Sequence, residues 1–213
     1  MNNQIKIFVL TLSLLILYSG CKDNRKKYWD NGNIQSELYY KDNKLNGVAT
    51  WYYLNGNKEQ EVHYTDNVIN GPLIRWYVNG NYESKSYYKD GKLEGKALMY
   101  DEDGNLLSEE NYINDTLVGK FTQWYPSGQI KISGSYIHGN YSGTWLYYDL
   151  KGEIVGTGNY VNGSGIQKAW HPNGNIMREI NYVNNLKHGE EKIYSSDGKI
   201  EKVNYYKEGI INN

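Results

Sequence analysis

Apolar and aromatic residues alternate with polar ones in short runs along this chain, and clusters of Asn, Asp and Gly separate each run from the next. The whole pattern recurs with a step of 24 residues, which shortens to 22 residues in a single unit. Counted from the opening residue as position 0, the units open at Asp23, Gly47, Gly71, Gly95, Gly119, Gly143, Gly165 and Gly189. A recurrence of this length predicts an array of short supersecondary units that stack against their neighbours.

Three positions hold the same kind of residue in all eight units: position 5 is Tyr or Trp, position 9 is Gly and position 17 is Tyr. The runs between them are rich in Tyr, Trp, Ile and Val and are too short for helices, so we expect strands. Position 8 is mostly Asn or Asp, and Asn-Gly or Asp-Gly between apolar runs is a strong hairpin signal. Turn-forming residues at positions 19 and 20, such as Asp42-Asn43, predict a second tight reversal in each unit.

These turns define the expected strand register. Pro126 and Pro172 at position 7 favour a type I turn followed by a left-handed glycine. The resulting three-residue loop with a bulge would pair position 5 with position 11, which is mostly Ile or Leu. We therefore predict an all-β fold: an elongated single antiparallel β-meander built from about eight 24-residue β-hairpin repeats, with roughly sixteen strands in one domain over residues 21–213.

The composition predicts a single-layer sheet with solvent on at least one face. The chain has 23 Tyr against 2 Phe, and Tyr suits a half-exposed position where the ring packs and the hydroxyl contacts water. This ratio favours a sheet with at least one solvated face over a thick globule. The formal net charge is −1 and no basic stripe is present, so we expect no binding of nucleic acid through its phosphates.

Residues 1–20 do not follow the repeat. Lys6 and the amino terminus precede an apolar run, residues 7–17, which is too short to span a bilayer and has the layout of a secretory signal. The small residues before Cys21, the only cysteine, are similar to a bacterial lipobox. That similarity implies cleavage before Cys21, a diacylglycerol on its thiol, and a membrane-anchored lipoprotein of the bacterial cell envelope, periplasmic or surface-exposed. The alternative is an ordinary signal peptide with an incidental cysteine.

The repeat itself resembles a known family. Its spaced Gly, Trp-Tyr, Asn-Gly, Glu, Tyr and Asp-Gly residues, clearest in residues 47–70, 71–94 and 119–142, look like the MORN-repeat variant of bacterial proteins. Many such proteins are YwqK-family antitoxins of toxin–antitoxin systems. The resemblance covers residues 23–213 and implies a β-hairpin array that binds a protein partner. Combined with the leader, it implies an immunity-like role against a toxin that arrives from outside the cell.

A second similarity supplies the alternative function. The segment 51–56, Trp-Tyr-Tyr-Leu-Asn-Gly, is similar to hairpins of choline- and glucan-binding cell-wall repeats. Those repeats usually carry a Gly-Trp pair, which this chain lacks. A wall-polysaccharide-binding module is therefore the alternative to a protein-binding module.

Residues able to carry chemistry do not converge in the sequence, and we expect no enzymatic activity, cofactor or metal site. The four His residues occupy four different repeat positions and form no ligand ladder. The glycine pairs 156/158 and 163/165 lack the following helix that a phosphate cradle needs, so we expect them in turns or bulges. Acidic residues at position 14, with lysines nearby, favour a solvated charged face over paired catalytic carboxylates. They are Glu37, Glu61, Glu109 and Glu179.

Residues 119–173 depart from the rest of the array because they are poor in charge, rich in aromatic residues and include the shortened unit. Such a stretch suits contact with a protein or sugar ligand, although it could also be the best-packed middle of the array. The candidate binding residues are Trp124, Tyr125, Trp145, Tyr147 and Trp170. Trp145 is the leading candidate because its repeat position does not require an aromatic ring. We expect Trp145→Ala to weaken binding and to cost less stability than Trp124→Ala.

Overall fold

The computed structural model describes residues 22–212, which form one antiparallel sheet and contain no helix. Its strands are β1 (Lys22–Tyr28), β2 (Ile34–Lys41), β3 (Lys44–Tyr52), β4 (Lys58–Thr65), β5 (Val68–Trp76), β6 (Tyr82–Lys89), β7 (Lys92–Leu93), β8 (Gly95–Tyr100), β9 (Leu106–Ile113), β10 (Thr116–Leu117), β11 (Gly119–Trp124), β12 (Ile130–Ile137), β13 (Asn140–Tyr148), β14 (Ile154–Val161), β15 (Ser164–Trp170), β16 (Ile176–Val183), β17 (Leu186–Tyr194), β18 (Ile200–Lys207) and β19 (Ile210–Ile211).

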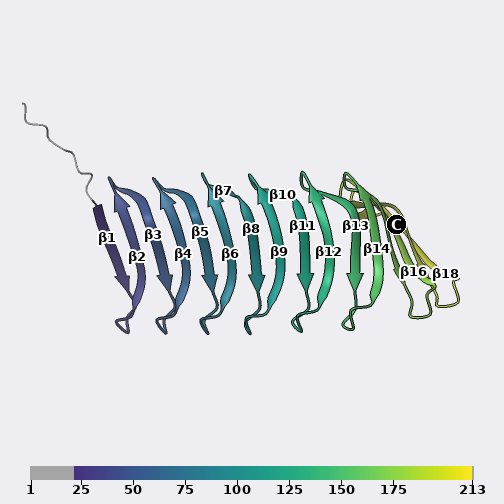
Figure 1. Ribbon diagram of the computed structural model, residues 1–213, viewed down its shortest axis with the longest axis horizontal. Helices are drawn as coiled ribbons and strands as arrows, with labels where there is room; N and C mark the ends of the chain where they lie inside the picture. The colour runs from purple at the N-terminus through teal and green to yellow at the C-terminus, as the bar shows by residue number, and fades with distance from the viewer. Residues whose placement is uncertain (1–21, 213) are drawn as a thin grey trace, which may run out of the picture.

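Each strand pairs with the strands before and after it in the chain, so the sheet is a simple meander of hairpins standing in a row (Figure 1). β7 and β8 are parts of one strand interrupted at Glu94, and β10 and β11 are interrupted in the same way at Val118. The described residues thus form eight hairpins followed by the short β19, which confirms the predicted fold class. Cys21 and the leader lie outside these residues.

The first turn of each hairpin has the predicted geometry. Tyr52 pairs with Lys58, which is the expected pairing of position 5 with position 11, and the register shifts just before it. The N–H of Gly56 donates to the carbonyl of Tyr53 (2.9 Å), and Gly56 has a φ of 89°. Only glycine adopts such a value cheaply, which explains why position 9 is always Gly.

The second turn, which joins each unit to the next along the chain, also forms hydrogen bonds to the unit before it. Its two residues both have positive φ, as at Asp66 (50°) and Asn67 (69°), which matches a two-residue hairpin turn of type I′. The N–H of Asn67 donates to the carbonyl of Leu45 (2.9 Å), and its side-chain Oδ1 accepts from the N–H of Leu45 (2.7 Å). These contacts tie successive turns into a ladder along one end of the sheet.

A bulge follows this second turn in the regular units. Between the pairs Val62–Leu73 and Tyr64–Ile69, one residue of β4 faces three residues of β5, so β5 carries two extra residues. The opening glycine, Gly71, lies in this bulge with a φ of 124°. The interrupted strands β7–β8 and β10–β11 carry their opening glycines at the corresponding place.

The 22-residue unit lacks this bulge. β14 and β15 pair without a register shift from Gly156–Ala169 to Val161–Ser164, so the two missing residues are the two that would have formed it. Gly165 accordingly shows no left-handed φ. It is required for space instead, because a Cβ there would lie 1.9 Å from the backbone oxygen of Asn159.

This finding corrects the prediction for the glycine pairs. Gly163 is a turn glycine with a φ of 76°, as expected. Gly156, Gly158 and Gly165 instead lie inside regular strands, where neighbouring backbone or rings occupy the space of a side chain.

At the shortened unit, the ladder of second turns continues through a side chain that spans two turns instead of one. Oδ1 of Asn185 accepts from the N–H of Tyr141 (2.9 Å), and its Nδ2 donates to the carbonyl of Gly139 (3.0 Å). Asn185 thus reaches past the turn of the short unit to the turn before it. Gly163, in the turn that is bypassed, is buried, and a Cβ there would lie 2.7 Å from Oδ1 of Asn185.

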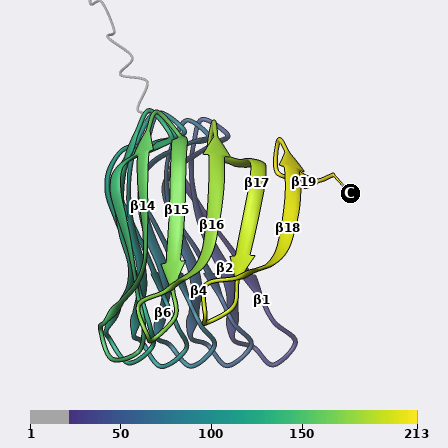
Figure 2. The same ribbon diagram turned by 90° about the vertical axis from the view of Figure 1, so that its right-hand side faces the viewer.

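The sheet curls from the shortened unit onward. Figures 1 and 2 show the strands after β14 turning away from the long row formed by the preceding hairpins. The rings of Tyr141 (β13) and Tyr182 (β16) come within 6.4 Å although their strands are three apart, a separation of about 14 Å in a flat sheet. The curl therefore closes on the side that carries these rings. We call it the tyrosine face, because it holds Tyr40, Tyr64, Tyr88, Tyr112, Tyr136, Tyr160, Tyr182 and Tyr206.

Little of this single layer is fully buried. The buried hydrophobic residues, Ala49, Val62, Trp145, Tyr160 and Ile180, all lie on the tyrosine face. Glu37, Glu61, Glu109 and Glu179 point to the opposite side, the charged face, because successive strand residues alternate between the two sides of a sheet. The fold is thus held by strand pairing and one half-buried face, as the tyrosine-rich composition indicated.

Candidate binding surface

The five residues predicted to bind a partner do not form one surface. Trp145 and Tyr147 lie in β13, on the tyrosine face. Trp124 ends β11, Tyr125 follows it, and Trp170 ends β15, so these three lie at the first-turn end of the sheet.

The structure corrects the interpretation of Trp145. Its side chain is buried, with 3% of the residue exposed, and it cannot serve as a surface anchor. The indole stacks on Phe121 (5.4 Å between ring centroids) and meets Tyr141 edge to face (4.7 Å). Its Nε1 donates to the carbonyl of Ser135 (3.2 Å). The extra aromatic residue is part of the core.

Glycines in the strands make room for these rings. A Cβ on Gly134 would lie 2.1 Å from the ring of Trp145, and one on Gly158 would lie 2.4 Å from the ring of Tyr160. Each ring therefore occupies the space over a strand glycine that a side chain there would fill. We call the resulting group the aromatic cluster; it comprises Phe121, Tyr136, Tyr141, Trp145, Tyr160 and Tyr182. Burial raises the pKa of Tyr136 and Tyr160, so their hydroxyls stay neutral.

Tyr147, the second candidate on this face, is half-buried beside the aromatic cluster. Burial raises the pKa of its hydroxyl. Its Cβ lies 3.4 Å from the position that a side chain on Gly156 would occupy.

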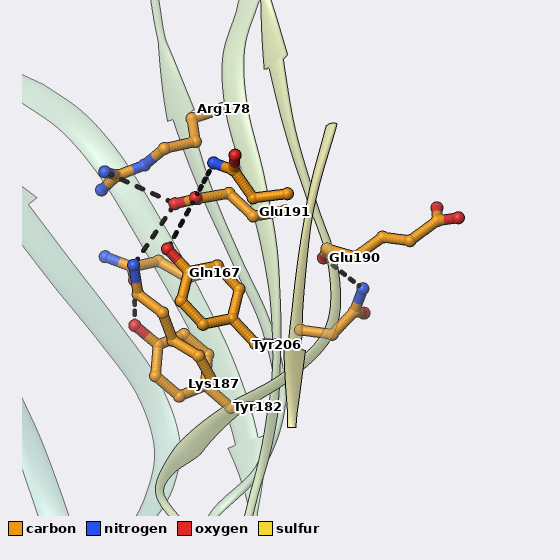
Figure 3. A network of polar contacts seen from close by, with 9 residues as sticks. Gln167, Arg178, Tyr182, Lys187, Glu190, Glu191 and Tyr206 are labelled. Carbon is orange, nitrogen blue, oxygen red and sulfur yellow. Dashed lines mark hydrogen bonds and ion pairs between the residues drawn. The ribbon is translucent and has the colours of Figure 1, made fainter. Parts of the chain in front are cut away.

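A polar network continues the tyrosine face beyond the aromatic cluster (Figure 3). Its centre is Glu191 on β17, which is 4% exposed. The carboxylate accepts from Nδ2 of Asn204 (2.8 Å) and from the hydroxyl of Tyr206 (3.1 Å). Nζ of Lys187 lies 3.3 Å away, and a guanidinium nitrogen of Arg178 lies 3.9 Å away. Because the carboxylate is surrounded by donors and cations, it stays ionised inside the curl.

The pKa of Glu191 reflects two opposed causes. Burial, the larger single effect, raises it. The hydrogen bonds from Asn204, Lys187 and Tyr206, together with the charge of Lys187, outweigh burial, and the pKa is lowered from the ordinary glutamate value.

Sequence reasoning missed this network although a signal was present. Glu191 occupies repeat position 2, where other units carry residues such as Ala49, Leu73 and Trp145. A carboxylate in a row of mostly apolar, inward-facing residues predicts either a buried ion pair or a site, because an isolated buried charge is very costly.

At most junctions the first-turn end is held by side chains that reach from one unit to the next; in the unit that opens at Gly95, Asp101 accepts hydrogen bonds within its own turn instead. The hydroxyl of Tyr53, at position 6, donates to the carbonyl of Trp76 (2.7 Å). Nδ2 of Asn57, at position 10, donates to the carbonyl of Val78 (3.0 Å). Tyr125 makes the same contact as Tyr53, since its hydroxyl donates to the carbonyl of the next unit (2.8 Å). The hydroxyl of this candidate is therefore engaged in holding two turns together.

The shortened unit does not make these contacts to the unit that follows. Asp149 holds position 6, and its Oδ1 accepts from the N–H groups of Lys151 and Glu153 within its own turn (2.8 and 2.9 Å). Glu153 holds position 10 in place of the bridging Asn. A cleft of about 450 Å³ lies between this turn and the next one. We call it the junction cleft; it is lined by Asp149, Glu153, Ile154, Val155, Trp170, His171, Pro172 and Gly174.

The charged face carries the predicted solvated ion pairs. Each acidic residue at position 14 has a lysine partner, and all of these side chains are partly exposed, so each pair contributes little to stability. The pairs are Lys26–Glu37 (3.1 Å), Lys58–Glu61 (2.6 Å), Lys96–Glu109 (2.9 Å) and Lys168–Glu179 (2.9 Å).

Within residues 22–212, no three His, Cys, Asp or Glu side chains gather as metal ligands would. His171 contacts the backbone of the next unit, with Nε2 2.9 Å from the carbonyl of Tyr194. That part of the chain also contains no helix long and apolar enough to cross a membrane.

The meander, its two ladders and its two unlike faces define the class of protein: an open, single-sheet β-hairpin repeat protein in which each unit contacts mainly its neighbours. The sequence profile described as MORN repeat variant matches residues 24–42, 45–66, 79–99, 93–114, 117–138, 164–184 and 187–208. These segments cover more than half of the chain, and the protein belongs to the MORN repeat variant family. A search of curated proteins gave no match. Residues 139–163, which include β13 and β14, fall between two matched segments.

Proposed function

We propose that this protein is a non-enzymatic repeat module that binds a protein partner through the region where the array departs from its own pattern. The observation that supports this proposal is a coincidence of three features in one place. The charge-poor stretch, the unit without a bulge and the longest internal segment outside the family profile all meet between β13 and β15. Exposed apolar residues, including Ile154 and Val155, border the junction cleft at this place.

The finer function that we propose is immunity-like. The antitoxin resemblance of the repeat and the secretory leader together favour neutralisation of a toxin that arrives from outside the cell. We further propose that the protein is anchored to a membrane of the cell envelope through a diacylglycerol on Cys21. Anchored there, the array would extend from the lipid and present its charge-poor region away from the membrane.

The binding proposal is tested by retrieving partners from an envelope extract with the folded array as bait. We expect a saturable protein partner that free sugars do not displace and that Trp170→Ala weakens. Trp76→Ala is the matched control, because Trp76 occupies the same repeat position in a regular unit. Retention on isolated cell wall with release by a competing sugar would replace the proposal with polysaccharide binding.

The anchoring proposal is tested separately. Cells that express the full chain are labelled with a fatty-acid analogue, and Cys21→Ser should abolish labelling and membrane retention. Unchanged labelling in Cys21→Ser would contradict lipidation at this residue.

A further inference from the structure

The junction cleft is built from the same repeat positions as a regular junction, but with different chemistry. Between the units that open at Gly47 and Gly71, Tyr53 and Asn57 bridge the two turns. The corresponding residues at the cleft are Asp149 and Glu153, which make no such bridge among the described contacts. Two neutral bridging side chains are thus replaced by two carboxylates beside an open space.

The regular junction shows what the ring at position 5 can bind. Nζ of Lys58, at position 11, lies 5.3 Å from the ring centroid of Trp76, within the range of a cation–π contact. The same ammonium is 2.6 Å from the carboxylate of Glu61. The array itself therefore places a cation within reach of both the Trp ring and a carboxylate.

At the cleft the ring is present but the internal cation is not; Thr157 stands where the regular unit has Glu61, and the carboxylates are instead those of Asp149 and Glu153 in the turn. Trp170 corresponds to Trp76, and the residue that corresponds to Lys58 is Ile154, an apolar side chain that is 51% exposed. Within residues 22–212, no ion pair involves Asp149 or Glu153. Of the nearby lysines, Lys168 is paired with Glu179 on the charged face (2.9 Å), and Lys151 lies in the exposed turn itself.

We propose that the junction cleft receives an arginine or lysine side chain from the partner protein. The cationic group would lie between the ring of Trp170 and the carboxylates of Asp149 and Glu153. The aliphatic stem would pack on Ile154 and Val155, since long basic side chains bury their methylenes along apolar surface. This inference rests on the proposed function and adds the chemistry by which the partner is recognised.

The test uses a small probe, so it does not depend on finding the partner. N-acetyl-arginine methylamide is titrated into the isotopically labelled array, and the indole N–H signals are followed by NMR. N-acetyl-citrulline methylamide has nearly the same shape without the charge and serves as the control ligand. We expect a saturable shift of the Trp170 indole with the arginine probe, a much weaker one with citrulline, and loss of affinity as salt rises.

Two variants sharpen the result. Glu153→Gln, which removes one charge from an exposed side chain, should weaken the arginine probe about three- to fivefold. Trp170→Ala removes the reporting indole, so its binding is followed through the backbone amide signals of the cleft residues, and it should weaken the probe by a similar factor. Trp76→Ala should leave the probe's affinity unchanged. Equal shifts with arginine and citrulline, no saturable shift, or full affinity in Glu153→Gln would overturn the proposal.

The two experiments distinguish failure of the cleft proposal from failure of the proposed binding function. If the array retrieves a protein partner but the arginine probe does not bind, the cleft proposal fails and the binding function stands. If the probe binds and no partner is retrieved, the binding function fails and the cleft remains a site for cationic groups.

Discussion

The array before Gly143 and the curled part after it use the same residues for different purposes. In the regular units, glycines at the turns and bulges supply backbone conformations, as shown by the φ of 124° at Gly71. Where the curl begins, Gly134 just before it and Gly158 and Gly165 within it instead supply space for rings and backbone. One residue type thus has two physical roles, and at Gly165 the removal of two residues decides which role applies.

The contrast extends to how each part is stabilised. The regular units rely on turn ladders and on partly exposed ion pairs, which contribute little individually. The curled part adds a buried aromatic cluster and a buried carboxylate network on the tyrosine face. We infer that the curled part is the more sensitive of the two to substitution of single side chains.

The largest effect is expected for Trp145→Ala. Removing a buried indole that contacts three other rings should lower the free energy of unfolding by about 3–5 kcal/mol. Trp124→Ala, at a half-buried position, should cost less. This order is the reverse of the one expected from the sequence. Urea denaturation of both variants measures it, and a smaller loss for Trp145→Ala would place the indole outside the core.

A somewhat smaller effect is expected where a glycine is required for space. Gly165→Asn should destabilise by about 3 kcal/mol, because the new Cβ would meet the backbone oxygen of Asn159. Gly80→Asn should cost less than about 1 kcal/mol, because Asn tolerates positive φ and nothing lies closer than 3.7 Å to its Cβ. Gly80→Val, β-branched at the same φ, should cost about 1–3 kcal/mol. Denaturant melts of the three variants are decisive, and equal losses for the two Asn variants would remove the distinction between the roles.

The smallest effect is a dependence on pH. The pKa of Glu191 is lowered in the folded chain, so its contribution is present above the unfolded-state pKa and is lost as pH falls through the folded-state value. Glu191→Gln should therefore cost about 1–2 kcal/mol near pH 7, and the difference from the unaltered protein should shrink toward about pH 3. Chemical denaturation at both pH values measures this. A constant difference would show that the carboxylate's charge is not what stabilises the network.

The sequence predicted the regular part well because each of its features has a local cause. Asn-Gly at positions 8 and 9 specifies one turn, positions 19 and 20 specify the other, and together they fix the register that pairs Tyr52 with Lys58. The step of 22 residues was visible too, but its meaning depends on a bulge that only the pairing of β14 with β15 reveals.

The candidate site was harder to predict because it depends on the curl. Trp145 departs from the repeat, and such a residue can either face a partner or fill the core; the bare backbone of Gly134 decided for the core. The sequence alone predicted no role for Asp149 and Glu153, because each is a single acidic residue in a turn. Their significance comes from the two bridging side chains that they replace, Tyr53 and Asn57 in a regular unit, and from Trp170 across the cleft.

The long contact made by Asn185 has a consequence for how the chain comes apart. A single-layer meander can unzip one hairpin at a time from its free edge, since each unit contacts mainly its neighbours. Asn185 joins its own turn to that of Tyr141, with the turn of Gly163 enclosed between them. Three successive turns are thereby held together, so the strands at the carboxyl-terminal end should detach as one group rather than one at a time. In a hydrogen-exchange experiment, the backbone amides of these three turns should exchange at similar rates, and the curled end should resist fraying.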